Sequence, residues 1–151
     1  GLTPLPGPRS TLDTTLPPRP PTGDEDFDAM KRLVEVVDSP SNAIFFDTGV
    51  TTEYGQDAVS AIRYFGSRNR IGLVHFRNVR VAEPHYRYTE TFIDEGECDI
   101  VACMRAFAAV SYEGGVDPDH TPGISGDSEE TQIGWAYAVG QLRALRLAAY
   151  A

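Results

Sequence analysis

The chain has 151 residues, a length that suits one compact domain but is short for a complete (β/α)8 barrel, which needs about 250 residues. Its 22 acidic residues outnumber 13 basic ones and give a net charge of −9, so nucleic acids and anionic membranes are poor candidate partners. No apolar run approaches the roughly 18 to 20 residues of a membrane span, and the start lacks a signal-peptide pattern. We therefore expect a soluble, cytoplasmic protein.

The distribution of proline divides the chain into two parts. Seven of the eleven prolines fall within residues 1–23, where they remove backbone donors and oppose both helix and central strand. We expect an extended proline-rich arm over residues 1–23 and one folded domain over residues 24–151.

The start of the folded domain shows helical and then strand-like patterns. Apolar residues recur at helical spacing from Phe27 to Val37, which predicts a helix that ends near Pro40. Short apolar runs at 43–46 and 71–76 predict strands that are buried on both faces, as is typical of parallel sheets.

The remaining elements continue this alternation. Helices are expected over 56–65, 98–110 and 129–149, with an irregular stretch around Pro84 and a short strand that ends at Asp117. This order predicts an α/β fold with three parallel strands, whose two sheet edges need a covering element. Cys98 and Cys103 are expected on different faces of one helix, a placement that disfavours a disulfide.

Groups that can bind metals follow each of the three predicted strands. Asp47 follows the first strand, His75 lies at the end of the second, and Asp119 and His120 follow the third. Because ligand sites of α/β folds lie at the carboxyl ends of strands, these side chains should share one rim. Carboxylate and imidazole donors suit Mn²⁺, Mg²⁺, Fe²⁺ or Zn²⁺. Each residue also has an ordinary structural interpretation, as a turn residue or a hydrogen-bonded polar group.

Several stretches resemble one enzyme family. The segments AIRYFGSRNRIGLVHFRNVR, ETFIDEGECDIVACMRAF, DPDH and AYAVGQLRAL are similar to consecutive parts of the mannonate dehydratases, which belong to the xylose-isomerase-like barrels. The combination of VHFRNV with ETFIDEG is the most specific part of this resemblance, which covers about residues 24–150. It implies a partial (β/α)8 TIM barrel consisting of about three C-terminal βα units.

The resemblance also implies a reaction and a set of site residues. The reaction is the dehydration of D-mannonate to 2-keto-3-deoxy-D-gluconate, with Mn²⁺ as the expected cofactor and Mg²⁺ or Fe²⁺ as alternatives. The family's metal ligands fall on His75, Asp119 and Asp47. At the position of Asp47 the family usually carries a cysteine. Its acid/base residue falls on His120, and its partner tyrosine on Tyr137.

Residues beside these positions have two interpretations each. Arg77 and Asn78 are either ligands for the substrate carboxylate and hydroxyls or a pair on a surface loop. His85 is expected on the solvated surface. Three aromatic residues could stack on a sugar ring but are more often core residues, namely Tyr64, Phe92 and Trp135.

The resemblance leaves one family motif without a counterpart. A further metal-binding histidine of the family lies in a His-Pro-Asx-Asp-Pro-Pro type motif, which residues 1–42 do not contain. Two other hypotheses therefore stand beside the lyase: a non-catalytic barrel remnant that acts as an assembly partner, and a sugar isomerase or epimerase of the same barrel group. The expected partners are a small sugar acid and either a second copy of the chain or a complementing barrel half.

Overall fold

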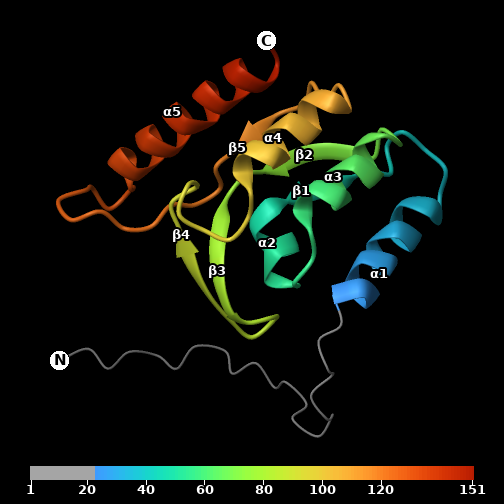
Figure 1. Cartoon of the computed structure of the whole chain (residues 1–151), viewed down its shortest axis with the longest axis horizontal. Helices are drawn as coiled ribbons and strands as arrows, with labels where there is room; N and C mark the ends of the chain where they lie inside the picture. The colour runs from blue at the N-terminus through green and yellow to red at the C-terminus, as the bar shows by residue number, and fades with distance from the viewer. Residues whose placement is uncertain (1–22) are drawn as a thin grey trace, which may run out of the picture.

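A computed structural model describes residues 23–151, and residues 1–22 lie outside the described part (Figure 1). The predicted proline-rich arm therefore falls almost wholly outside the description. The elements, in chain order, are α1 Gly23–Glu35, β1 Ile44–Asp47, α2 Thr48–Glu53, α3 Ala58–Gly66, β2 Ile71–His75, β3 Asn78–Glu83, β4 Arg87–Thr91, α4 Ile100–Ala109, β5 Val116–Asp117 and α5 Gln132–Ala149. This mixture of helices and strands confirms the predicted α/β class.

Three parallel strands organise the domain. They lie in the order β1, β2, β5, with every neighbouring pair parallel. Asp47 at the end of β1 pairs with His75 of β2, and His75 pairs with Asp117 of β5. The carboxyl ends of the three strands therefore lie level at one rim, as the sequence predicts.

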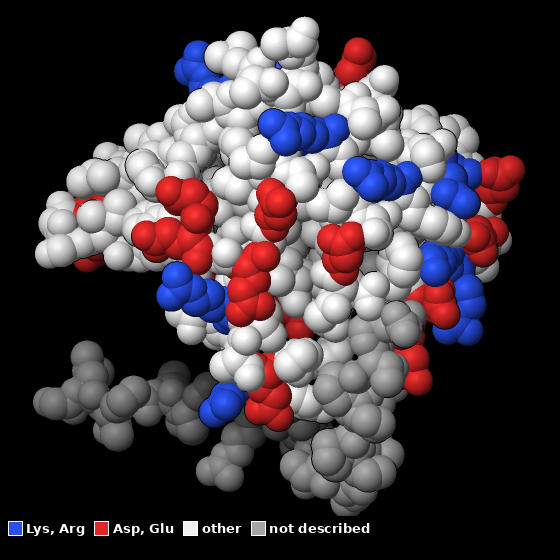
Figure 2. Space-filling model, viewed as in Figure 1, with Lys and Arg blue, Asp and Glu red and all other residues white. Residues whose placement is uncertain are grey.

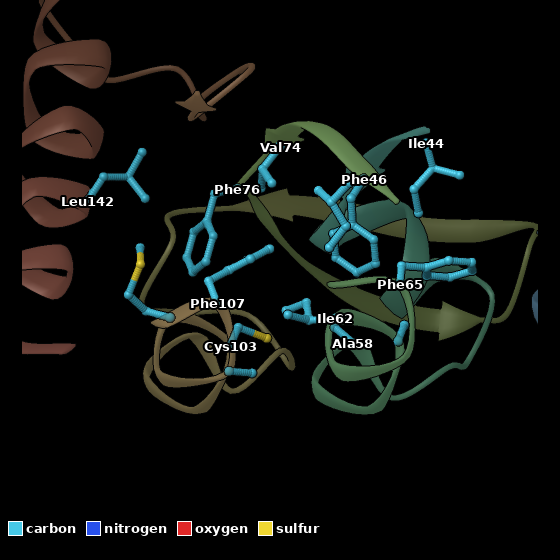
Figure 3. Close-up of a cluster of buried hydrophobic side chains, with 14 of the residues drawn as sticks. Ile44, Phe46, Ala58, Ile62, Phe65, Val74, Phe76, Cys103, Phe107 and Leu142 are labelled. Carbon is cyan, nitrogen blue, oxygen red and sulfur yellow. The ribbon is translucent and has the colours of Figure 1, made fainter. Parts of the chain in front are cut away.

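The hydrophobic core lies between this sheet and two helices, α3 and α4 (Figure 3). Phe46 of β1 and Phe107 of α4 are fully buried, with ring centroids 6.0 Å apart in an edge-on arrangement. Ile62 and Phe65 of α3 are also fully buried, because the helical spacing of these residues puts them on the face that meets the sheet. This packing fixes the strands whose ends form the rim.

The opposite face of the sheet is partly open, which corrects one prediction. Phe45 of β1 is 53% exposed and Leu73 of β2 is 38% exposed, although both strands were expected to be buried on both faces. The apolar runs identified the strands correctly. Full burial of this face requires a covering layer that residues 23–151 do not provide.

A β-hairpin replaces the predicted irregular stretch around Pro84. β3 and β4 pair antiparallel in a separate two-stranded sheet, from Asn78 opposite Thr91 to Glu83 opposite Arg87. His85 in the turn is not a solvated surface residue as expected. Its ring stacks on that of Tyr54 at 5.3 Å, and its Nε2 lies 3.3 Å from Oδ2 of Asp26.

The cysteine pair also differs from the prediction. Cys98 precedes α4 instead of lying within it, and the helix begins after the N-cap residue Asp99, whose Oδ1 accepts a hydrogen bond from the Ala102 N–H at 2.9 Å. The positions just before the N-cap and four residues after it face one another, as in a hydrophobic staple. The Sγ atoms of Cys98 and Cys103 are therefore only 3.4 Å apart, and the expectation of different faces was wrong.

The first and last helices flank the domain. α1 ends at Glu35, earlier than expected, and Leu33 is 59% exposed, whereas Val34 is buried in the core. α5 packs along α4 through Ala138 and Leu142 (Figure 1). None of the helices in residues 23–151 combines the length and apolar character that crossing a bilayer requires.

Candidate metal centre

Side chains from the three strand ends meet at the rim. Asp47, His75 and Asp119 each offer one donor atom, and these atoms lie within 4.8 Å of one another. Nδ1 of His75 is 3.6 Å from Oδ2 of Asp47 and 3.4 Å from Oδ2 of Asp119. All three side chains keep some contact with solvent, with exposures of 14%, 25% and 20% respectively. The predicted ligand set is thus brought together, facing an accessible space.

Asp47 has two tasks, one for each carboxylate oxygen. Its Oδ1 accepts a hydrogen bond from the Val50 N–H at 2.8 Å and so caps the N-terminus of α2. Its Oδ2 points to His75 and to the guanidinium of Arg77. Because the cap fixes the rotation of the carboxylate, α2 holds Oδ2 in the site.

Asp119 is positioned by an unusual backbone conformation. Its φ is +63°, in the left-handed region that a non-glycine residue adopts only when its surroundings impose it. Asp117 imposes it here, because its Oδ1 accepts a hydrogen bond from the Asp119 N–H at 2.7 Å. In the Asp-Pro-Asp segment the first aspartate therefore makes the turn, and the second lies beside His75.

Arg77 lies at the centre of an acidic cluster. It is 4% exposed, and its Nε is 3.0 Å from Asp47 Oδ2 and 3.5 Å from Asp119 Oδ2. Its Nη1 lies 3.2 Å from Glu90 Oε1, and its Nη2 forms a 2.9 Å ion pair with Glu53 Oε1. The cation thus joins carboxylates from β1, α2, β4 and the loop after β5.

The charges of this cluster depend on one another. Burial alone would lower the pKa of Arg77, but the surrounding carboxylates, led by Asp47, raise it above its ordinary value. Burial raises the pKa of Glu53, and the ion pair with Arg77 offsets part of that effect. Acidic side chains also gather across the middle of the face shown in Figure 2. Four carboxylates surround the single positive charge of Arg77, so their excess negative charge favours binding of a second cation beside it.

Two residues in the first turn of α2, Thr48 and Gly49, fit closely against Arg77. The hydroxyl of Thr48 donates a hydrogen bond to the carbonyl of Arg77 at 2.6 Å and accepts one from its N–H at 3.0 Å. A Cβ at Gly49 would lie 2.6 Å from Nη1 of Arg77, closer than any stable contact. The first turn of α2 is therefore shaped around the Arg77 side chain.

Asn78 is engaged entirely with the protein. It is 1% exposed; its Nδ2 donates to the carbonyls of Ile93 and Cys98, and its Oδ1 accepts from the N–H groups of Val79 and Cys98. Both side chains are buried, so the interpretation of Arg77 and Asn78 as a surface-loop pair is wrong. Their contacts support a positioning role, and their contact with a substrate stays a prediction.

The two predicted proton-transfer residues lie on different elements. His120 is 59% exposed; its Nε2 is 2.8 Å from Asp119 Oδ2 and its Nδ1 is 3.3 Å from Glu90 Oε1. Tyr137 lies on α5, where its hydroxyl donates to Asp94 at 3.3 Å and accepts from Gln141 at 3.1 Å. The geometry joins His120 directly to the metal-ligand cluster, whereas Tyr137 contacts the loop that contains Asp94.

The donor set fits a hard divalent cation. Two carboxylates and one imidazole suit Mn²⁺, Mg²⁺ or Fe²⁺ better than a structural zinc site, which usually uses thiolates. Arg77 contacts Oδ2 of both Asp47 and Asp119, and a carboxylate oxygen that accepts one such contact keeps a further lone pair with which it can bind a metal. Three ligands also leave coordination positions for water and substrate.

Comparison with known proteins agrees with this geometry. The family model described as D-mannonate dehydratase (UxuA) matches residues 17–149. The chain belongs to the D-mannonate dehydratase family. A mannonate dehydratase of Enterococcus faecalis is 40% identical over 94 residues, which are 60% of this chain and 26% of that relative. The mannonate dehydratase of Thermotoga petrophila is 33% identical over 107 residues, 70% of this chain and 30% of the relative.

Solved structures place the fold in the same group. The mannonate dehydratase from Streptococcus suis serotype 2 superposes with a TM-score of 0.71 and 26% identity, over 81% of this chain and 36% of the other. A xylose isomerase domain protein from Planctomyces limnophilus gives a TM-score of 0.61 at 22% identity, over 83% of this chain and 45% of the other, and supports the fold alone. This mannonate dehydratase family member thus has the fold of part of a TIM barrel. It spans 26% and 30% of the length of the two sequence relatives.

Sequence reasoning missed three members of this cluster. Glu90 begins the ETFIDEG segment, but its side chain could be placed near Arg77 only once the β3–β4 hairpin was known. Glu53 lies on the short helix α2, which was not predicted. The side chain of Asp117, which accepts the hydrogen bond from the Asp119 N–H, was not predicted as part of the site, and its position two residues before Asp119 was the available signal.

Proposed function

We propose that this chain supplies the metal-binding rim of a lyase that dehydrates D-mannonate to 2-keto-3-deoxy-D-gluconate. The observation that carries the proposal is the convergence of Asp47, His75 and Asp119 within 4.8 Å at the carboxyl ends of three parallel strands. Membership of the mannonate dehydratase family supports the sugar acid as substrate. We propose Mn²⁺ as the bound ion, with Mg²⁺ and Fe²⁺ as alternatives that the same donors accept.

The residues of the rim divide into binding and proton transfer. Asp47, His75 and Asp119 would hold the ion, which supplies Lewis-acid stabilisation of the charge that develops on the substrate carboxylate. His120 is exposed beside these ligands, so we assign it a proton transfer in the elimination of the C2 proton and the C3 hydroxyl. Arg77 holds Asp47 and Asp119 in position from the buried side.

Tyr137 is proposed as the second proton-transfer residue. Partial desolvation, followed by the charge and hydrogen bond of Asp94, raises the pKa of Tyr137, so the phenol is protonated at neutral pH. A protonated phenol can donate a proton to a departing hydroxyl. Tyr137 is 46% exposed, so its side chain is not enclosed by the protein.

The test begins with metal content. The full chain, purified and loaded with Mn²⁺, is analysed for bound metal and then supplied with D-mannonate while 2-keto-3-deoxy-D-gluconate is measured. Stoichiometric metal with turnover supports the lyase. If the chain binds metal without turnover, the result supports the ligand set and indicates that the reaction needs further parts of the barrel. If the chain shows no bound metal and no turnover, the result supports the assembly-partner hypothesis instead.

The ligand role of His75 has a matched control in the same chain. We expect His75→Ala to weaken Mn²⁺ binding at least about tenfold, because it removes one of three ligands. His85→Ala removes a histidine whose contacts are with Tyr54 and Asp26, and should leave the affinity unchanged. Titration calorimetry compares the two variants. Equal affinity in His75→Ala and in the unmodified chain would remove His75 from the site.

A further inference from the structure

Cys98 and Cys103 form a close pair at the start of α4, and neither residue belongs to the proposed metal-ligand set. Their Sγ atoms are 3.4 Å apart, and both are free thiols. Cys103 is fully buried in the core between α3 and α4, whereas Cys98 is only partly covered. Cys98 is therefore the more exposed residue of the pair.

The local backbone holds this arrangement in place. Asp99 caps α4, so Cys98 and Cys103 occupy the facing positions of a staple. The peptide groups on both sides of Cys98 are also fixed: its N–H donates to Asn78 Oδ1 and its carbonyl accepts from Asn78 Nδ2, each at 3.0 Å. Gly96 is part of the same frame, because a Cβ there would collide with the Asn78 side chain. Cys98 is thus restrained close to Cys103.

We propose that Cys98 and Cys103 are a redox-active pair that forms an intrachain disulfide when the protein meets a peroxide. The disulfide needs the sulfur atoms to approach from 3.4 Å to about 2.05 Å, a movement that side-chain rotation can provide. This site is independent of the proposed lyase function, since it uses none of the metal ligands.

The chemistry proceeds in two balanced steps. The Cys98 thiolate attacks hydrogen peroxide, so that an S–O bond forms, the O–O bond breaks, and the leaving hydroxide takes a proton to become water. Cys103 sulfur then attacks the Cys98 sulfenic acid; the S–S bond forms, the S–O bond breaks, and the Cys103 proton leaves with hydroxide as a second water. Two thiols are oxidised and one peroxide is reduced.

The protonation states of the pair favour Cys98 as the first nucleophile. A hydrogen bond from Cys103 holds the pKa of Cys98 below its ordinary value. The same contact, together with burial, raises the pKa of Cys103. The more exposed residue, Cys98, therefore carries the more readily ionised thiol, and the buried residue, Cys103, resolves the sulfenic acid.

The test is oxidation of the reduced full chain with stoichiometric hydrogen peroxide under native conditions. We expect the intact mass to fall by two hydrogen atoms, with both thiols lost to maleimide and no covalent dimer. In Cys103→Ser the sulfenic acid of Cys98 should persist and be trapped by dimedone, whereas in Cys98→Ser the buried Cys103 should stay a thiol. Addition of oxygen to the unmodified chain without the mass loss, or only cross-linked dimers, would overturn the proposal.

A second comparison separates the folded geometry from mere closeness in sequence. The same oxidation is followed in urea at the same pH, where four residues of flexible chain lie between the two cysteines. We expect the folded chain to form the disulfide at least about tenfold faster, because its thiols are already adjacent. An equal or faster rate in urea would show that the native arrangement does not promote the reaction and would contradict the proposal.

Discussion

At the scale of single residues, the candidate site depends on one buried cation. Arg77 neutralises part of the charge of Asp47, Glu53, Glu90 and Asp119, and its side chain is only 5% exposed. A buried charge is stable only while its partners stay in place, because desolvation is otherwise uncompensated. Residues that merely leave room for Arg77 are therefore as important to the site as those that contact it.

Gly49 provides the clearest test of this dependence. Gly49→Ala places a methyl group 2.6 Å from Nη1 of Arg77 and should destabilise the protein by about 1 to 3 kcal/mol. Gly140→Ala is the matched control, because a Cβ there meets nothing within 4 Å on an exposed part of α5. The control should be stabilised by about 0.5 to 1 kcal/mol through higher helix propensity. Urea unfolding of both variants measures the difference, and similar shifts in the two would contradict the crowding argument.

The aspartate at position 47 sets the hardness of the proposed metal site. Asp47→Cys restores the residue type that the family resemblance suggests, and its thiolate should shift preference from Mn²⁺ towards Zn²⁺ by at least about tenfold. Asp47→Asn, which keeps an oxygen for the N-cap of α2, controls for loss of the helix cap. Competition titrations with the two ions check this expectation. An unchanged preference in Asp47→Cys would indicate that residue 47 does not contact the metal.

At the scale of elements, the sequence predicted those parts whose hydrophobic pattern is long or uninterrupted. β1 and β2 were evident from buried apolar residues such as Phe46 and Val74, and α4 from the spacing of Met104 and Phe107. The β3–β4 hairpin was missed because most of its residues are exposed and polar, and Pro84 lies in its turn. α2 has six residues, too few for a helical period to be visible.

The same reasoning applies to the site. The three metal-binding candidates could be predicted because strand ends of a parallel sheet share a rim, which depends only on topology. The contacts of Glu53 and Glu90 with Arg77 could not be predicted, because these residues lie on α2 and β4, two elements that the sequence did not reveal. The contact of Cys98 with Cys103 depended on the exact start of α4, the least certain feature of a predicted helix.

The cap of α3 gives this helix a dependence on pH. Asp57 accepts hydrogen bonds from the N–H groups of Val59 and Ser60, and its bond with the Ser60 side chain, followed by these backbone bonds, lowers its pKa below the usual 3.8 although burial opposes this. A lowered folded-state pKa stabilises the protein above the unfolded-state pKa, and this contribution is lost as the pH falls through the folded value.

Asp57→Asn tests that linkage. Asparagine still caps the helix but does not titrate, so the stability advantage of the unmodified chain over Asp57→Asn should shrink as the pH falls from 7 to about 3. Urea midpoints of both proteins across this range measure the difference, and other titrating groups cancel in the comparison. A constant difference at all pH values would show that ionised Asp57 contributes nothing to the cap.

At the scale of the whole molecule, the open face of the sheet is the dominant feature. Helices α3 and α4 cover one face (Figure 3). Phe45 and Leu73, in contrast, remain exposed. Within residues 23–151, β1 and β5 each pair with only one strand, which leaves an unpaired edge at both sides of the sheet. Exposed edges and an apolar face favour association with another sheet.

We therefore expect the chain, studied alone, to associate with further copies of itself. Sedimentation velocity over a range of micromolar concentrations should show dimers or larger species, because association buries the side chain of Phe45, now 53% exposed, and pairs the strand edges. Phe45→Ser should shift the equilibrium towards the monomer. Val36→Ser, which removes an apolar side chain that is 74% exposed away from the strands, should not. A folded monomer at every concentration would contradict this expectation. It would show that the chain is stable with this face of the sheet exposed to solvent.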